Sequence, residues 1–299
     1  MTNDTKCGLV AILGAPNAGK STLVNALVGQ KVAIVSPKAQ TTRTRLMGIA
    51  IHDDAQILLL DTPGIFAPGR RLDRAMVKSA WEGAEDADRL IVLIDAAASI
   101  GKKVEMLIDG VVNRPEPKIL VFNKVDIANK RELLALAQDL TARLDPEQVF
   151  MISAKNGEGV IDLKQHLAAV MPEGPWHFPE DQLSDATDRM VAAEFTREQL
   201  YNQLHQELPY ASAVVTEKWE ERPDGSTAIH QQIRIARDSQ KGIVLGKGGS
   251  KLKSIGEAAR QEISEHLGRR VHLFLHVKVD PKWDEDREIY EEVGLDWSA

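Results

Sequence analysis

Residues 14–21 read Gly-Ala-Pro-Asn-Ala-Gly-Lys-Ser, and this stretch decides how the first half of the chain folds. It follows an apolar run at 8–13 and opens a segment of helical character at 20–28. Two glycines with four residues between them, followed by a lysine and a hydroxyl residue, form an anion-binding loop when they join a strand to a helix. The sequence therefore predicts that phosphates bind at this turn, with Lys20 reaching them.

Apolar runs of four to eight residues recur beyond this loop and alternate with helical stretches. The runs lie at 8–13, 55–60, 89–94, 118–122 and 149–152. Continuous apolar runs separated by helices are typical of parallel strands that are buried on both faces. The pattern predicts a doubly wound α/β domain with a mostly parallel sheet, which a helix at 159–170 closes.

A proline- and glycine-rich break follows that helix, at residues 172–180. Beyond it the pattern predicts the order α-β-β-α-α-β, starting with a helix that Ser184 caps and that runs to about Glu207. The last strand is expected at 271–279, and the acidic tail at 281–299 is expected on the solvent side. We expect a first domain at 1–172, a linker at 173–184 and a smaller α+β domain at 185–299.

Composition excludes several classes of protein. Among 299 residues there is one cysteine, Cys7, so an internal disulfide framework and a thiolate-rich zinc site are excluded. No apolar run approaches the roughly 20 residues that cross a bilayer, and the polar N-terminus lacks the pattern of a signal peptide. We therefore expect a cytoplasmic protein.

Charge is unevenly placed along the chain. The formal net charge is −7, yet residues 230–280 hold ten basic and five acidic side chains. This asymmetry indicates that one segment meets a polyanion, although an ordinary mixed surface would explain the charge alone equally well.

Three further motifs follow apolar runs in the first domain. Asp61-Thr62-Pro63-Gly64 places a carboxylate where it can hold Mg²⁺ and a backbone N–H, that of Gly64, where it can contact a terminal phosphate. The hydroxyl of Ser21 in the phosphate loop is expected to bind the same Mg²⁺. This motif alone would be weak evidence of a nucleotide site, since a lone Asp-x-x-Gly is usually a turn.

Asn123-Lys124-Val125-Asp126 supplies what a guanine base requires. The Asp126 carboxylate can accept hydrogen bonds from the ring N1–H and the exocyclic amino group, neither of which adenine offers. Asn123 is expected to tie this loop to the phosphate loop, and the stem of Lys124 can cover the base. Residues 153–155, Ser-Ala-Lys, follow another run and can offer backbone N–H groups to the guanine oxygen.

Four such motifs in this order, each at the C-terminal end of a strand, resemble the translation-factor class of P-loop GTPases. The whole chain resembles the Era family of bacterial GTPases. The resemblance implies hydrolysis of GTP to GDP and phosphate. It also implies a first switch at Gln40-Thr41-Thr42-Arg43, with Thr42 joining Mg²⁺, and order in 35–45 and 64–73 that depends on the γ phosphate. The expected nucleotide-binding residues are Gly14, Asn17, Ala18, Gly19, Lys20, Ser21, Thr22, Asp61, Gly64, Asn123, Lys124, Asp126, Ser153, Ala154 and Lys155.

One position departs from the small-GTPase pattern. Where Ras-like enzymes place a water-orienting glutamine after the glycine, this chain has Ile65, so hydrolysis must be organised otherwise. One hypothesis is that Asn17 coordinates K⁺, which neutralises charge in the transition state, with Lys20 and Thr42 as the other catalytic residues. The alternative is slow intrinsic turnover, with Asn17 only shaping the loop.

Arg43 and Arg45 are further candidates for stabilising charge, although solvated side chains are expected at both positions.

The glycine-rich loop of the second domain reads Gly246-Lys247-Gly248-Gly249, with Lys251 and Lys253 close behind it. Together with the α-β-β-α-α-β order and the local positive charge, this stretch resembles a type II KH domain, whose Gly-x-x-Gly loop clamps a single-stranded RNA backbone. These six residues are therefore the expected RNA-binding set.

The surface that would contact bases is expected to include Ile243, Val244, Leu252 and the edge of the hairpin strand. Trp219 and Phe274 could stack on bases, but packing in the core or hairpin is expected for both.

Resemblance to the Era family implies a ribosome-assembly GTPase that binds 16S rRNA near its 3′ end and helps the 30S subunit mature. We expect a monomer with no DNA partner, although the sequence leaves the oligomeric state open. A rival from another class is a signalling switch at the inner face of the cell membrane, whose basic surface meets anionic lipid. A third possibility is an RNA-binding module that uses GTP structurally without hydrolysing it.

Overall fold

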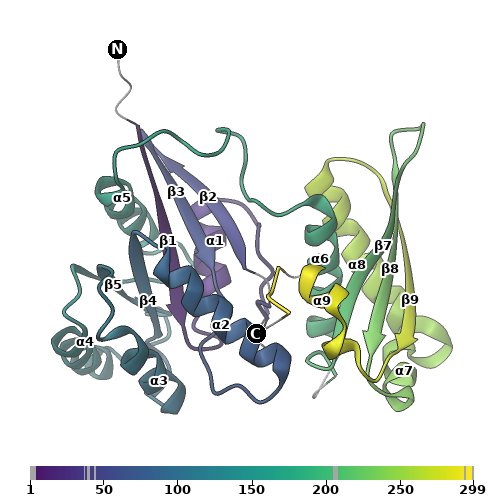
Figure 1. Ribbon diagram of the computed structural model, residues 1–299, viewed down its shortest axis with the longest axis horizontal. Coiled ribbons are helices and arrows are strands. Elements are labelled where there is room, and N and C mark those ends of the chain that lie inside the picture. Colours follow the sequence, from purple (N-terminus) through teal and green to yellow (C-terminus); the bar gives the residue numbers. More distant parts are fainter. Residues whose placement is uncertain are drawn as a thin grey trace. The chain divides into compact units, whose positions relative to one another are not determined.

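The computed structural model describes residues 5–36, 38, 41–43, 45–204, 208–292 and 294–297. The chain divides into two compact units, of which the first extends to Asp185 and the second begins at Ala186 (Figure 1). Residues 173–184, which the sequence suggested as a linker, thus belong to the first unit. Within the described residues, no helix has the length and apolar character needed to cross a membrane.

The first unit is built on a six-stranded sheet in the order β2-β3-β1-β4-β5-β6. All neighbouring strands are parallel except β2, which runs antiparallel to β3. The strands are β1 (Lys6–Gly14), β2 (Leu46–His52), β3 (Ala55–Asp61), β4 (Arg89–Asp95), β5 (Lys118–Asn123) and β6 (Gln148–Met151). Strand β2 was not predicted, because Gly48 interrupts its apolar run. That glycine lets helix α1 pack closely, since a Cβ there would lie 2.7 Å from Val24 Cγ1.

Helices pack on this sheet in two groups. Helices α2 (Arg71–Glu85), α3 (Lys102–Val111) and α4 (Lys130–Leu144) share one buried apolar cluster with β1, β4 and β5. Helices α1 (Lys20–Val28) and α5 (Val160–Val170) contact each other and β3. The predicted doubly wound α/β fold is confirmed.

The segment after α5 is tied to the sheet of the first unit by a buried glutamine. The side-chain oxygen of Gln56, in β3, accepts hydrogen bonds from the N–H groups of His177 (2.9 Å) and Phe178 (3.1 Å). The amide group of the same side chain donates to the carbonyl of Phe178 at 2.9 Å. A proline- and glycine-rich composition therefore does not leave this stretch loose.

Residues 183–185 pair with the outer edge of β2. The N–H of Ile49 donates to the carbonyl of Leu183 at 2.8 Å, and the N–H of Met47 donates to the Asp185 carboxylate at 2.9 Å. The N–H of Asp185 donates back to the Met47 carbonyl at 3.2 Å. The segment thus forms a short antiparallel bridge immediately before the second unit begins.

The second unit has the predicted α-β-β-α-α-β order, followed by a short tail. Its sheet runs β7-β8-β9, with β8 antiparallel to β7 and parallel to β9. Figure 1 shows α6 and α8 side by side against this sheet, and their apolar residues form one core with those of the strands. The elements are α6 (Asp188–Gln203), β7 (Ser212–Glu221), β8 (Thr227–Ile235), α7 (Asp238–Leu245), the 3₁₀ turn η1 (Lys247–Gly249), α8 (Ser250–Leu267), β9 (Val271–Val279), η2 (Trp283–Glu285) and α9 (Arg287–Glu292).

The first helix of this unit begins later than predicted. Thr187, and not Ser184, caps it, because the Thr187 hydroxyl accepts a hydrogen bond from the Met190 N–H, whereas Ser184 lies in the bridge to β2. The helix ends at Gln203, and residues 205–207 lie outside the described part of the chain.

The tail after β9 is packed, so its prediction as a solvent-side segment was wrong. Trp283 and Tyr290 are buried, and Asp286 forms an ion pair with Arg234 of β8. Burial of two large aromatic side chains outweighs the acidic character of the segment, on which the prediction rested alone.

Candidate nucleotide site and nucleic-acid interface

The carboxyl ends of β1, β3, β4 and β5 meet around a cavity of about 660 Å³. Ligands bind at this edge in open α/β sheets, near the point where the strand order reverses. The side chains and backbone that line it come from the phosphate loop, from the segment between α1 and β2, and from the loops after β3, β4, β5 and β6. The lining residues are Pro16, Asn17, Gly19, Lys20, Ser21, Thr22, Ile34, Val35, Ser36, Thr41, Thr42, Gly64, Asp95, Lys124 and Lys155.

The phosphate loop has the backbone that its sequence requires. Gly19 has a φ of 98°, and a Cβ at this position would lie 2.3 Å from the Asn123 side-chain nitrogen. Asn17 is also left-handed, with a φ of 66°. Glycine adopts such a φ without cost and asparagine tolerates it better than most residues, which accounts for both choices.

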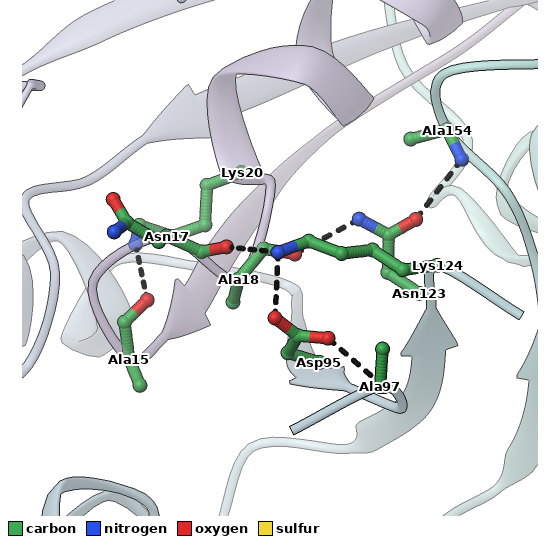
Figure 2. A network of polar contacts seen from close by, with 9 residues as sticks. All are labelled: Ala15, Asn17, Ala18, Lys20, Asp95, Ala97, Asn123, Lys124 and Ala154. Carbon is green, nitrogen blue, oxygen red and sulfur yellow. Dashed lines mark hydrogen bonds and ion pairs between the residues drawn. The ribbon is translucent and has the colours of Figure 1, made fainter. Parts of the chain in front are cut away.

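Lys20 lies at the floor of the loop and is only 6% exposed. Its ammonium donates to the carbonyl of Gly14 at 3.2 Å. It also donates to the carbonyl of Ala15 at 3.2 Å (Figure 2). Burial lowers the pKa of Lys20 to about 8, and the Asp61 carboxylate opposes this shift. A buried ammonium is stabilised by a neighbouring anion, so this position favours a bound phosphate.

Three oxygen-bearing side chains converge beside Lys20. The Ser21 hydroxyl donates to the Asp61 carboxylate at 2.7 Å and lies 2.8 Å from the Thr42 hydroxyl, which is 3.3 Å from the same carboxylate oxygen. The sequence predicted this trio from three separate motifs, and the structure brings it together. Oxygen atoms of this kind are the ligands that Mg²⁺ prefers.

Asn123 joins its own loop to the phosphate loop, as the sequence predicted, and also to the 153–155 loop, which was not predicted. Its amide nitrogen donates to the Ala18 carbonyl at 2.8 Å, and its amide oxygen accepts from the Ala154 N–H at 2.9 Å. Figure 2 shows this side chain between the phosphate loop and the 153–155 loop. Burial of Asn123 makes both hydrogen bonds costly to break.

The remaining predicted residues differ in their placement. Lys155 lines the cavity, and Ser153 is buried beneath it. Asp126 is exposed on the loop after β5 and is not among the residues that line the cavity. Gln40, in the first switch, lies outside the described residues.

Gly64 and the residue after it occupy different environments. A Cβ on Gly64 would lie 2.9 Å from the backbone nitrogen of Pro16, so the phosphate loop packs directly on this glycine. Ile65 is 1% exposed and belongs to the core shared with α2 and α3. Its side chain therefore takes no part in the cavity.

The two switch arginines differ in their surroundings. Arg43 is 3% exposed, so the expectation of a solvated side chain there was wrong. Arg45 lies 4.0 Å from the Asp86 carboxylate, near the end of α2. Neither arginine is among the lining residues.

Several lining residues were not named individually by the sequence. Val35, Ser36 and Thr41 lie inside the 35–45 segment whose order was expected to depend on the γ phosphate, and Ile34 lies just before it. A segment without regular structure carries no periodic signal that would single out its lining residues. Asp95 carried a signal that could have been used, since it ends the apolar run of β4 as Asp61 ends that of β3.

The glycines in the loop between α7 and α8 of the second unit differ in their surroundings. Gly246 has a φ of 71°, and a Cβ there would lie 2.6 Å from Lys251 Cβ, so this residue is needed for packing against α8. Gly248 and Gly249 are also left-handed, but a Cβ on either would meet open space. Lys247 and Lys253 are exposed around them.

A groove of about 420 Å³ continues from this loop between α8 and β9. Its floor is apolar, with Leu252, Leu273 and Leu275, and charged side chains stand at its rim. The lining residues are Gly249, Leu252, Lys253, Gly256, Glu257, Arg260, Leu273 and Leu275. The sequence identified the loop end of this groove and missed most of the rest, because β9 reaches α8 only through the tertiary fold.

One prediction for the base-contacting surface was wrong, because Val244 is fully buried in the core. The strand beside the groove is β9, and neither hairpin strand is among the residues that line it. Phe274, expected in the core or hairpin, is 46% exposed and stacks on His230 with ring centroids 4.6 Å apart.

Known proteins resemble this chain over almost its full length. Residues 9–124 match the family described as 50S ribosome-binding GTPase, and residues 207–284 match the KH domain. The GTPase Era of Erythrobacter litoralis is 64% identical over 98% of both chains, and that of Afipia carboxidovorans is 55% identical over 98% of this chain and 95% of its own.

Two solved structures agree with this chain in fold. They are a variant of Aquifex aeolicus Era bound to GDP and AlF₄⁻, and an Era in complex with MgGDPNP and nucleotides 1506–1542 of 16S ribosomal RNA. Each has a TM-score of 0.91 and 37% identity, over 97% of this chain and 99% of its own. With a phosphate loop, a guanine-type motif and a KH unit in one chain that these relatives match end to end, the chain belongs to the Era family of GTPases.

Proposed function

We propose that this GTPase binds GTP in the cavity of the first unit, hydrolyses it there, and couples the nucleotide state to RNA binding by the second unit. The observation that carries the proposal is the convergence of Lys20, Ser21, Thr42 and Asp61 on one side of the cavity, with Asn123 fixing the loops around it. Nucleotide phosphates and a hard cation are what such a set of groups would hold.

The donor set around Ser21 fits Mg²⁺. Two hydroxyl oxygens and one carboxylate oxygen approach one another within 2.7–3.3 Å. Mg²⁺ is usually held by one or two such protein oxygens, with phosphate oxygens and water as the other ligands. Ser21, Thr42 and Asp61 would hold the ion, which would supply positive charge to the phosphates.

In the reaction, water attacks the γ phosphorus, the bond to the β–γ bridging oxygen breaks, and GDP and phosphate leave. Lys20 would neutralise charge on the β and γ phosphates, and the Gly64 N–H would contact the γ phosphate. Because Ile65 is buried in the core, no side chain at that position can orient the water. Asn17 is exposed and lines the cavity, which supports the hypothesis that it coordinates K⁺.

The second unit would bind the RNA. Open space around Gly248 and Gly249, exposed lysines beside them and an apolar groove fit the way KH domains hold a backbone and bury bases. A relative was solved with nucleotides of 16S rRNA, which supports the same class of RNA here. We infer that the protein acts as a cytoplasmic monomer near the 3′ end of 16S rRNA during assembly of the 30S subunit.

A path for coupling runs through the chain itself. The segment between α1 and β2 lines the cavity, and β2, which follows it, is bridged to 183–185, directly before the second unit. A change at Thr42 on loss of the γ phosphate would therefore act on the strand that holds residues 183–185, which directly precede the second unit in the chain.

GTP turnover tests this proposal. The full chain is assayed in KCl with Mg²⁺, alone, with an RNA copying the 3′ end of small-subunit rRNA, and with a scrambled RNA. Acceleration by the first RNA alone would support one coupled switch. Absence of phosphate release under every condition would contradict the proposed chemistry. Binding to vesicles of anionic lipid that RNA does not compete with would instead favour a membrane switch.

A further inference from the structure

Asp95 stands at the end of β4, inside the cavity, and has no role in the functions described so far. Both oxygens of its carboxylate are engaged. One accepts a hydrogen bond from the Ala97 N–H at 3.0 Å, which fixes the carboxylate on its own turn. The other accepts from the Lys124 ammonium at 2.6 Å (Figure 2).

The Lys124 ammonium has a second hydrogen-bond partner, which lies in the phosphate loop. It donates to the backbone carbonyl of Asn17 at 2.8 Å, so one ammonium links the loop after β4 to the phosphate loop. Figure 2 shows Lys124 extended between Asp95 and Asn17. Three loops that are far apart in the sequence therefore share a single charged group.

The phosphate loop and the loop after β5 each carry an unusual backbone at this point. Asn17 has a φ of 66° and Lys124 itself a φ of 65°, a region that most side chains avoid. A left-handed conformation of a residue other than glycine persists when the surroundings fix it. The contacts of the ammonium fix the carbonyl of the first residue and the side chain of the second.

The negative charge of Asp95 suggests a second effect on the Lys124 ammonium. A nucleotide in the cavity brings several negative charges near Lys124, and a flexible ammonium would be drawn toward them. The Asp95 carboxylate supplies a competing partner that is held on the cavity wall. Side-chain exposures of 22% for Asp95 and 31% for Lys124 mean that solvent screens the pair only in part.

We propose that Asp95 is a positioning residue for nucleotide binding. It holds the Lys124 ammonium against the Asn17 carbonyl, and thereby keeps the guanine-recognition loop and the phosphate loop in the register that one nucleotide spans. The inference rests on the proposed placement of the nucleotide in this cavity.

The test measures the dissociation rate of a fluorescent GDP analogue from the full chain. Asp95→Ala is expected to release it about five-fold faster, because a charge-assisted hydrogen bond in a partly exposed place is lost. Asp95→Asn, whose amide oxygen can still accept from Lys124, is expected to recover part of the loss. On a Lys124→Ala background, Asp95→Ala is expected to change the rate by less than about two-fold, because the group on which it acts is absent.

Glu105→Ala is the matched control. Glu105 forms an ion pair of the same length, 2.6 Å, with Arg143 in the same unit, and it does not line the cavity. If its release rate and that of the wild type agree while Asp95→Ala releases faster, a general loss of stability is not the cause. Thermal unfolding without nucleotide checks this directly, and similar midpoints are expected for both variants.

Two outcomes distinguish failure of the positioning role from failure of the proposed nucleotide site. If Lys124→Ala releases the nucleotide faster and Asp95→Ala does not, or if their effects multiply in the double variant, the positioning role is overturned while the nucleotide site stands. If neither Lys20→Ala nor Lys124→Ala alters binding, the nucleotide lies elsewhere and both proposals fail.

Discussion

Among single residues, Asp126 is the one predicted to select the base, and its placement differs from that of the other predicted residues. It is exposed on its loop, whereas Asn123, three residues earlier, is buried and fully engaged. One residue therefore builds the loop, and the other is exposed where it can face the ligand. Substitution of Asp126 should alter recognition without disturbing the fold.

Asp126→Asn is expected to weaken GTP binding on the order of 100-fold, because the amide oxygen can accept only one of the two hydrogen bonds from guanine and the amide NH₂ group faces the other guanine donor. That NH₂ group can donate to the exocyclic C2 carbonyl oxygen of xanthine, so the variant should bind xanthosine triphosphate more tightly than the wild type does. Competition of both nucleotides against a fluorescent GDP analogue measures the change. Unchanged affinity for GTP would refute the role of this carboxylate.

Asn17 has a prediction of its own. If its side chain coordinates K⁺, turnover in KCl should exceed turnover in NaCl by at least about ten-fold, and Asn17→Ala should remove the difference. Phosphate release at equal ionic strength measures both. Equal rates in the two salts would leave only the role of shaping the loop.

The nucleotide site shows what single residues disclose before a structure exists. Ser21, Asp61 and Asn123 were predicted because each belongs to a motif at the end of a strand, and the carboxyl ends of parallel strands meet at one edge. Burial of Arg43 was missed, because burial of a charged side chain depends on partners that are remote in the sequence. The bond from Lys124 to Asp95 was missed for the same reason, since the two residues are 29 positions apart.

At the scale of elements, the loop between α7 and α8 combines two requirements. Gly246 serves packing, whereas Gly248 and Gly249 leave open space for a ligand. Prediction from sequence found the loop but could not separate these roles, since all three glycines look alike in a motif. Because a Cβ on Gly248 meets open space, a substitution there can be compared with one at a similar glycine outside the loop.

Gly248→Asp is expected to lower the affinity for RNA by at least roughly ten-fold, because it adds a negative charge where phosphates approach. Gly268→Asp is the control. Gly268 ends α8 with a φ of 61°, nearly that of Gly248, and a Cβ there also meets open space. The same strain and charge away from the loop should leave binding unchanged, as measured by fluorescence anisotropy. Equal losses in both variants would contradict a clamp at this loop.

Helix α5 contains a histidine whose titration affects stability. His166 packs against the Phe150 ring, and burial lowers the pKa of His166, an effect that Glu147 opposes. Because the folded state binds this proton less tightly than the unfolded state, stability is lost as the pH falls through 6.5. His166→Phe should therefore lose less free energy of unfolding between about pH 7.5 and pH 5.5 than the wild type, as measured by urea unfolding. An identical loss of free energy of unfolding in both proteins would contradict the effect assigned to His166.

At the scale of the whole molecule, the coupling between nucleotide and RNA is expected to depend on the bridge between β2 and residues 183–185. Asp185→Ala removes the carboxylate that accepts from the Met47 N–H. RNA-stimulated GTP turnover should then fall toward the unstimulated rate, while nucleotide affinity stays unchanged. The control is Asp181→Ala, which removes an exposed carboxylate from the same segment.

If Asp185→Ala retains full stimulation by RNA, the signal does not pass through this bridge. Loss of stimulation in both variants would point to charge in the segment and not to the hydrogen bond.

The architecture was predicted more fully than these connections. Apart from β2, the strand order of the first unit and the α-β-β-α-α-β order of the second follow from local periodicity, which a sequence displays directly. The pairing of 183–185 with β2, and the meeting of α8 with β9, join residues that local pattern cannot relate. Residues 173–184 looked like a linker for this reason, since prolines and glycines conceal the hydrogen bonds that Gln56 makes.

The bridge between β2 and residues 183–185 also covers an outer strand that could otherwise pair with another molecule. β2 is one of the two outer strands of the sheet, and an uncovered outer strand offers its backbone groups to a strand from another molecule. Residues 183–185 pair with the first half of that strand, at Met47–Ile49. The same three residues that would carry a signal therefore also keep the sheet from growing into an aggregate, so a GTPase unit cut before Leu183 should be less soluble than one that ends after Asp185.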